Sequence, residues 1–95
     1  MTESDVQAAI CDYLKTRDIW HFRCSVGRKG GYRYGGPPGT PDIIGMYQGK
    51  FLGIECKGPD GKLSEEQVVV GQSIRRHGGV YIIAREVEDV VNALT

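Results

Sequence analysis

The sequence lacks a long apolar run, an excess of charge of either sign and any closely spaced pair of cysteines. No stretch approaches the roughly 18 apolar residues that a membrane-spanning helix needs, and the N-terminus lacks the basic and then apolar segments of a secretory signal. We therefore expect a cytoplasmic protein with no membrane partner. The cysteines, Cys11, Cys24 and Cys56, are an odd set without a C-x-x-C pair. Because this pattern argues against a disulfide framework and against a cysteine zinc site, we expect them to be reduced and mostly buried.

With 95 residues, of which 40% are hydrophobic and 25% charged, the chain can build one hydrophobic core and not two. We therefore expect a single domain over residues 1–95. A chain of this length buries only roughly 60–65% of the surface that it exposes when unfolded. Because such a core is marginal, we expect the protein to pair with a second copy as a homodimer.

Positive charge is concentrated in one segment, although twelve basic and twelve acidic residues cancel over the whole chain. No acidic residue lies between Asp18 and Asp42, whereas four basic residues do: Arg23, Arg28, Lys29 and Arg33. Residues 27–40 also hold six of the fourteen glycines, so we expect a long flexible loop and not a helix or strand. A basic loop with interleaved aromatic residues suits a phosphate backbone, and the alternative is a loop that is only solvated. The loop lacks the lysine-serine ending of an ATP-binding P-loop, so we expect no nucleotide cofactor.

Apolar periodicity and turn signals predict helices and strands in the order α-β-β-β-α-β-α. Ser4 and Gln7 have the spacing of a capping box at the start of the first helix. Ser64 and Gln67 have the same spacing at the start of the second helix, and Gly78 marks its end. Strands are expected at 19–26, 42–47, 51–57 and 80–84, and a last short helix at 87–94.

The two strands around a predicted Gln-Gly turn at 48–49 place acidic side chains opposite each other. In this hairpin Asp42 pairs with Glu55, and opposed residues share a face with Cβ atoms roughly 4.5–5.5 Å apart. Lys57, two residues after Glu55, points to the same face. Two opposed carboxylates repel unless a cation or a shared proton lies between them. We therefore expect a Mg²⁺ or Mn²⁺ site, since these ions take few protein oxygens and keep open positions.

Apolar residues around the carboxylates favour a buried site. The alternative is that Asp42 only starts a strand while Glu55 and Lys57 form an exposed ion pair. Both faces of the two strands are apolar, however, which is typical of a sheet covered by helices on both sides. The carboxylate face carries Ile44, Met46 and Phe51, and the opposite face carries Ile43, Leu52, Ile54 and Cys56. We expect the charged groups at the edge of a buried layer, with Lys57 orienting water and offsetting charge on a phosphate.

Pro41-Asp42 and Glu55-Cys56-Lys57 resemble the signature of the PD-(D/E)XK nucleases. A narrower resemblance covers nearly the whole chain, from about residue 3 to residue 91. It comprises an N-terminal acid before a helix ending in Tyr-Leu, the glycine-rich basic loop, Gly-Thr-Pro-Asp-Ile-Ile-Gly at 39–45, Ile-Glu-Cys-Lys at 54–57 and Leu-Ser-x-x-Gln at 63–67. Together these segments resemble the VRR-NUC domain, the virus-type replication-repair nuclease.

The resemblance implies a role for individual residues. Asp42 and Glu55 would be metal ligands together with the backbone carbonyl of Cys56, and Lys57 would be the catalytic lysine. Gln67 matches a glutamine that supports the site in the family, and its alternative role is helix capping only.

Glu3 matches an N-terminal acid that the family directs toward a second metal or its water. On a helix Glu3 projects near the mean direction of the apolar residues Val6, Ile10 and Leu14, so we expect it to face inward. Gln7, one turn further on, is the substitute for this role if Glu3 is disordered.

We therefore expect a small α/β, restriction-endonuclease-like fold with a mixed four-stranded sheet flanked by helices. The expected activity is metal-dependent hydrolysis of DNA phosphodiesters by a bacterial or phage-encoded homodimer, and the resemblance favours four-way junctions or flaps as substrates. Trp20 and Phe22 are expected in the core or at the dimer contact. The alternative function is a catalytically silent DNA-binding or assembly module with the same fold. RNA stays open as a substrate, although no aromatic RNA-binding motif supports it.

Overall fold

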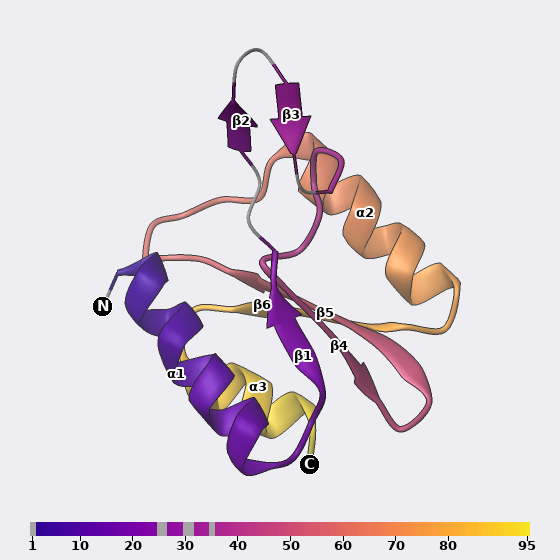
Figure 1. The fold of residues 1–95 in the computed structure, drawn as a ribbon. Coiled ribbons are helices and arrows are strands. Elements are labelled where there is room, and N and C mark those ends of the chain that lie inside the picture. The colour runs from indigo at the N-terminus through magenta and orange to yellow at the C-terminus, as the bar shows by residue number, and fades with distance from the viewer. Residues whose placement is uncertain (1, 25–26, 30–31, 35) are drawn as a thin grey trace.

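The computed structural model describes residues 2–24, 27–29, 32–34 and 36–95, with the backbone alone at 27–29 and 32–34. The chain forms an α/β domain whose helices lie on both sides of a mixed four-stranded sheet, as predicted (Figure 1). Among the described ranges, no helix has both the length and the apolar character needed to cross a membrane. The elements are α1 (Glu3–Thr16), β1 (His21–Arg23), β2 (Gly27–Lys29), β3 (Tyr32–Tyr34), β4 (Ile43–Tyr47), β5 (Lys50–Cys56), α2 (Glu65–Arg76), β6 (Val80–Ala84) and α3 (Val87–Ala93).

The four-stranded sheet has the order β1-β4-β5-β6. β1 and β5 run antiparallel to β4, whereas β6 runs parallel to β5 and follows it in the chain after α2. The β4–β5 hairpin has the predicted register, in which Tyr47 pairs with Lys50. Gln48 and Gly49 form the turn with φ of 52° and 78°, the positive values that a tight two-residue turn requires.

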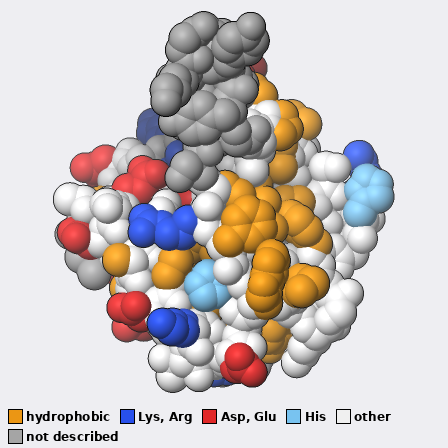
Figure 2. Space-filling model, in the orientation of Figure 1, with side chains coloured by type: hydrophobic (Ala, Val, Ile, Leu, Met, Phe, Trp, Pro, Cys, Tyr) orange, Lys and Arg blue, Asp and Glu red, His pale blue; other side chains and the backbone are white. Residues whose placement is uncertain are grey.

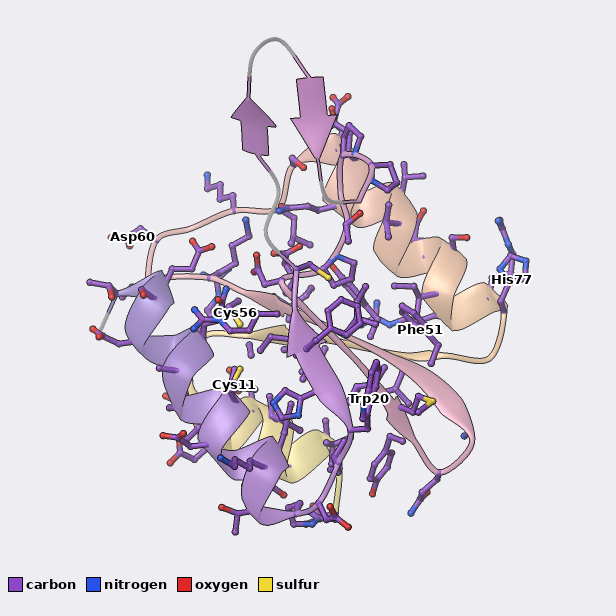
Figure 3. The ribbon with its side chains drawn as sticks, viewed as in Figure 1. Cys11, Trp20, Phe51, Cys56, Asp60 and His77 are labelled. Carbon is purple, nitrogen blue, oxygen red and sulfur yellow. The ribbon has the colours of Figure 1, made fainter. Side chains whose placement is uncertain are left out.

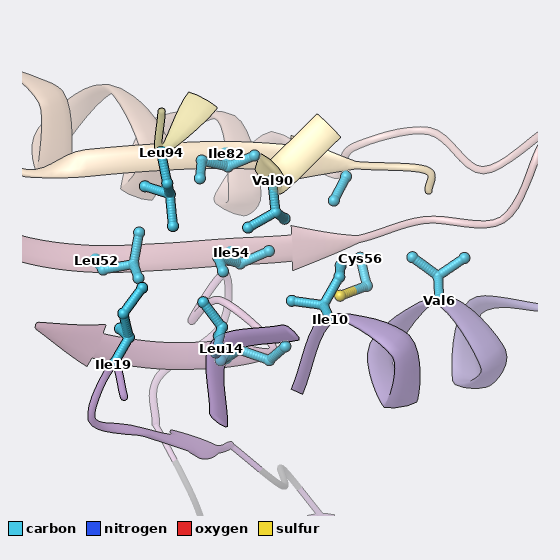
Figure 4. Close-up of a cluster of buried hydrophobic side chains, with 12 residues drawn as sticks. Val6, Ile10, Leu14, Ile19, Leu52, Ile54, Cys56, Ile82, Val90 and Leu94 are labelled. Atoms are coloured by element: carbon cyan, nitrogen blue, oxygen red, sulfur yellow. The ribbon is translucent and has the colours of Figure 1, made fainter. Parts of the chain in front are cut away.

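α1 and α3 cover one face of the sheet and enclose the main hydrophobic core (Figure 4). The hairpin residues predicted for this face are all fully buried, namely Ile43, Leu52, Ile54 and Cys56. They cluster with side chains of α1 and α3, including Val6, Ile10, Leu14 and Val90, and with Leu94 directly after α3. The alternation of side chains along β4 and β5 therefore predicted this face correctly.

α2 covers only part of the opposite face, so the predicted cover by helices is wrong for the remainder. α2 packs on β5 and β6, while Met46 and Phe51 nearer the hairpin turn are 59% and 45% exposed. Trp20 and Phe22 are exposed as well, and their rings meet edge to face with centroids 5.5 Å apart. One helix about 10 Å wide covers roughly two strands spaced about 4.8 Å apart, so the strands nearer β1 stay open.

The capping box of α1 begins two residues earlier than predicted. Thr2, not Ser4, is the N-cap, and its hydroxyl accepts a hydrogen bond from the N–H of Asp5 at 3.1 Å. In return the Asp5 carboxylate accepts from the N–H of Thr2 at 3.0 Å. A capping aspartate reaches the same donor as the glutamate or glutamine of the usual pattern, so the helix begins at Glu3 and the predicted Ser4–Gln7 box is not used.

The segment predicted as a structureless loop contains a short ribbon. β2 and β3 pair antiparallel, with Gly27 opposite Tyr34 and Lys29 opposite Tyr32, and the ribbon projects from the body of the molecule (Figure 1). Glycine content predicted a loop, but tyrosines favour extended backbone and pairing satisfies its polar groups. The predicted order of elements is therefore two strands short, and β1 at His21–Arg23 is shorter than the predicted 19–26.

Candidate functional site

Asp42 and Glu55 lie side by side at one end of the sheet. Asp42 comes directly before β4, and the hairpin register continued by one residue places it opposite Glu55 of β5. The Oδ2 atom of Asp42 accepts a hydrogen bond from the N–H of Cys56 at 2.8 Å. Its backbone carbonyl accepts from the N–H of Cys24 at 2.7 Å. Asp42 is therefore tied to the strands on both sides of it, with its carboxylate directed at β5.

The carboxyl group of Glu55 is buried in unfavourable surroundings. The residue is 1% exposed, and its Oε1 atom has no hydrogen-bond partner. Burial raises the pKa of Glu55 to about 9, and a hydrogen bond to Asp42 and the negative charge of that residue add to the rise, while Lys57 opposes it. Without a cation the site therefore favours a neutral Glu55 beside Asp42.

Lys57 brings positive charge to the same end of β5. Its N–H donates to the carbonyl of Ala84 at 2.9 Å, which extends the β5–β6 pairing by one residue. The side chain is 9% exposed and its stem runs close to Gly61, where an added Cβ would lie 3.3 Å from Cδ. The ammonium is close enough to lower the pKa of Glu55, so two acids and one base share this end of the sheet.

The donor set suits a hard divalent cation. Asp42 and Glu55 offer carboxylate oxygens, one of which is buried and unpaired, and Mg²⁺ and Mn²⁺ prefer such ligands. No group of three or more His, Cys, Asp or Glu side chains arranged for a metal occurs in the described part of the chain. The resemblance implies the backbone carbonyl of Cys56 as a further ligand. The Cys56 thiol itself lies in the core, where burial raises its pKa to about 12.

Glu3 and Gln67 are less engaged with the site than the resemblance implies. Glu3 is exposed at the start of α1, and its backbone N–H lies near Gly58, just after Lys57. Its charge raises the pKa of Glu55, and this is the smallest of the contributions to that pKa. The Oε1 atom of Gln67 accepts from the N–H of Ser64 at 2.8 Å, so this side chain serves the predicted capping box of α2.

The basic residues predicted to bind DNA fall into two groups. Arg23 is exposed on β1, where Nε donates to Oε1 of Gln7 at 2.7 Å and Nη2 donates to the same oxygen. Gln7 therefore contacts the arginine of β1. The side chains of Arg28, Lys29 and Arg33 lie outside the described residues, although their backbone forms β2 and β3.

Sequence analysis missed a tyrosine that the fold brings to this site. Tyr81 of β6 pairs with Gly53, so it shares a face with Glu55 two residues further on. It is 6% exposed, and burial raises its pKa to about 12, with further contributions from the charges of Glu55 and Asp42. No local pattern could have found it, because β5 and β6 are separated in the chain by α2.

Figure 3 shows where labelled side chains lie along the β4–β5 hairpin. Cys56 lies at the end of β5 nearest α1, whereas Trp20 and Phe51 lie toward the hairpin turn. No protein-family model and no curated protein matches this chain.

Proposed function

We propose that this chain is a metal-dependent DNA nuclease of the VRR-NUC type, with a restriction-endonuclease-like fold. The half-buried Asp42 beside the buried Glu55 carries the proposal, because holding two carboxyl groups together, one of them out of water, costs free energy that a divalent cation offsets. Lys57 beside the pair supports hydrolysis of a phosphodiester over simple cation storage. The resemblance of residues 39–45, 54–57 and 63–67 to the VRR-NUC motifs supports the same choice.

Asp42, Glu55 and the carbonyl of Cys56 would hold Mg²⁺ or Mn²⁺. When bound, such an ion polarises a phosphoryl oxygen as a Lewis acid. The hydrogen bond from Cys56 N–H fixes the direction of the Asp42 carboxylate before any ligand arrives. Lys57 would orient a water molecule and offset the negative charge that develops on the phosphate as its ester bond breaks. Burial of these groups strengthens each of their electrostatic interactions.

DNA is the expected substrate because basic residues concentrate in the segment of the chain that precedes Asp42. Arg23 on β1 and the residues of the β2–β3 ribbon, Arg28, Lys29 and Arg33, would contact the phosphate backbone. A projecting ribbon reaches surfaces beyond the sheet, which suits selection by DNA shape. The resemblance makes four-way junctions or flaps the first substrates to test.

Cleavage assays with defined DNA structures test the proposal. Purified protein is incubated with branched, duplex and single-stranded DNA in Mg²⁺, Mn²⁺ or EDTA, and Mn²⁺ binding is measured by calorimetric titration. We expect cleavage that EDTA abolishes, and loss of both cleavage and Mn²⁺ binding in Asp42→Asn. Asp12→Asn, an exposed residue of α1, is the matched control and should behave as the unmodified protein. Unchanged Mn²⁺ affinity in Asp42→Asn would refute the metal site.

A catalytically silent DNA-binding or assembly module is the second candidate function. The resemblance implies that Glu3 and Gln67 serve catalysis. Glu3 is exposed, however, and Gln67 is engaged in a helix cap, and both observations favour a silent module. The same assay separates the two functions. DNA binding without cleavage in either metal would establish the silent module.

We propose further that the active species is a homodimer that sets two sites against two DNA strands. Trp20, Phe22, Met46 and Phe51 are exposed on the open sheet face, and Figure 2 shows apolar side chains gathered there. An open apolar face of this kind favours a protein contact. Light scattering at micromolar concentration should give twice the chain mass, and the two strands of a labelled junction should be cut together. A strictly monomeric protein that still makes paired cuts would refute the link between pairing and function.

A further inference from the structure

Two buried polar atoms of the described residues have no hydrogen-bond partner, and both belong to one region. They are Oε1 of Glu55 and the hydroxyl oxygen of Tyr81. An unpaired buried polar group is costly, so proteins rarely retain one without a use. Phenylalanine would fill the same space at position 81 and would leave no hydroxyl to satisfy. Packing alone therefore does not explain why position 81 carries a hydroxyl group.

The register of the sheet brings these two groups within reach of each other. Tyr81 pairs with Gly53 and Ile83 pairs with Glu55, so the tyrosine and the glutamate are diagonal neighbours on one face. A diagonal pair on adjacent strands is within reach of aromatic and long side chains. The negative charge of Glu55 acts on the tyrosine hydroxyl, as does that of Asp42. The phenol thus belongs to the electrostatic surroundings of the carboxylates.

The Tyr81 ring is held in one position by α2. Gly71 presses on it so closely that an added Cβ would lie 2.5 Å from Cε2 of the ring. Arg75, one turn further along α2, donates from Nη2 to the Tyr81 carbonyl at 3.1 Å and places its guanidinium carbon 5.3 Å from the ring centroid. The contacts with α2 therefore fix the position of the Tyr81 hydroxyl oxygen. A fixed oxygen is what a side chain needs to position a neighbouring group.

We propose that Tyr81 is a positioning residue of the carboxylate site: its hydroxyl donates a hydrogen bond to a water molecule, and that water donates to Oε1 of Glu55. The shared water satisfies both buried atoms and stops the Glu55 carboxyl group from rotating. A fixed carboxylate presents its oxygens to a cation at lower entropic cost, as supporting residues of metal sites do. This inference rests on the proposed metal-dependent function.

The test compares two tyrosine variants that lose different hydroxyls. Tyr81→Phe removes the hydroxyl beside the site, whereas Tyr47→Phe removes one that donates to the carbonyl of Leu94 at 2.7 Å, next to the hairpin turn. Mn²⁺ affinity is measured by calorimetry, and Tm is measured by thermal unfolding in EDTA. The constants kcat and KM are measured on the DNA structure that the unmodified protein cleaves fastest. We expect Tyr81→Phe to weaken Mn²⁺ binding about tenfold and to lower kcat about tenfold, with KM and Tm unchanged. Tyr47→Phe should lower Tm and leave Mn²⁺ affinity and kcat as they are.

A second variant keeps the inference testable if Tyr81→Phe folds poorly. Gly71→Ala retains the tyrosine but pushes its ring aside, so it should also weaken Mn²⁺ binding, whereas Gln72→Ala on the exposed side of α2 should not. Mn²⁺ affinity within twofold of the unmodified protein in Tyr81→Phe would overturn the role of the tyrosine alone. If the unmodified protein bound no Mn²⁺, the proposed function would fail and this inference would fail with it.

Discussion

Replacing Glu55 with glutamine should stabilise the metal-free protein at neutral and higher pH. The carboxyl group is buried beside Asp42, and its pKa rises from 4.5 to about 9 in the folded chain. Between these two values the folded state binds a proton that the unfolded state has released. The free energy of unfolding therefore falls as pH rises from about 4.5 toward 9, by about 1.4 kcal/mol for each pH unit.

The expected effect is large for a chain of this size. Relative to the acidic limit, the unmodified protein loses about 3 kcal/mol by pH 7, against a total stability of about 5–15 kcal/mol for ordinary domains. Glutamine has nearly the same volume and stays neutral in both states, so Glu55→Gln avoids this loss. A difference of about 3 kcal/mol corresponds to more than about 10 °C in Tm for a domain of this length.

Thermal unfolding in EDTA from pH 5 to pH 9 measures the effect. Tm of the unmodified protein should fall across this range, while Glu55→Gln should show a nearly flat profile and the higher Tm above pH 6. Glu66→Gln, an exposed position on α2, is the matched control and should follow the unmodified protein. Saturating Mn²⁺ should reverse the order, because a ligand stabilises only the protein that binds it. A Glu55→Gln protein less stable than the unmodified one at pH 8 in EDTA would refute the reasoning.

Three further predictions concern the lysine, the first helix and the basic ribbon. Lys57→Ala should bind Mn²⁺ normally and lose cleavage, and full activity in this variant would remove the lysine from the site. Thr2→Ala should cost about 1 kcal/mol of unfolding free energy by loss of the N-cap, whereas Ser4→Ala should cost little, and equal losses would contradict the observed cap. Alanine in place of Arg28, Lys29 and Arg33 should weaken DNA binding, measured by fluorescence anisotropy in a salt series. The slope of the logarithm of the binding constant against the logarithm of the salt concentration should fall in magnitude by roughly 0.9 for each phosphate that is no longer neutralised. An unchanged affinity and slope would mean that the ribbon is only solvated.

Local signals in the sequence predicted the parts of the site that depend on short-range geometry. The Gln48-Gly49 turn sets the hairpin register locally, because its two residues adopt the positive φ values of the tight turns that are favoured between antiparallel strands. That register brings Asp42 opposite Glu55, so the carboxylate pair was visible in the spacing of the sequence. The capping box of Ser64 and Gln67 likewise predicted the start of α2, since all its hydrogen bonds lie within four residues.

Competing local signals explain the errors near the N-terminus and in the basic segment. Thr2-x-x-Asp5 and Ser4-x-x-Gln7 both have capping-box spacing, and the helix uses the earlier one, with Thr2 as its N-cap. The sequence did not reveal the β2–β3 ribbon, because the glycines of this segment indicate a loop, whereas residues 27–29 pair with residues 32–34.

The sequence by itself therefore determined the α/β class, the hairpin with its two opposed carboxylates and the capped second helix, since these follow from turn chemistry and alternation within a few residues. Only the tertiary structure decided what surrounds the carboxylates. α2 separates β5 from β6 in the chain, yet the two strands pair in parallel. This pairing places Tyr81 beside Glu55. The width of a single helix also left Met46 of β4 exposed, although its alternation predicted burial, and Phe51 beside the hairpin turn is exposed as well. Both outcomes depend on packing between elements far apart in the chain, which no local pattern encodes.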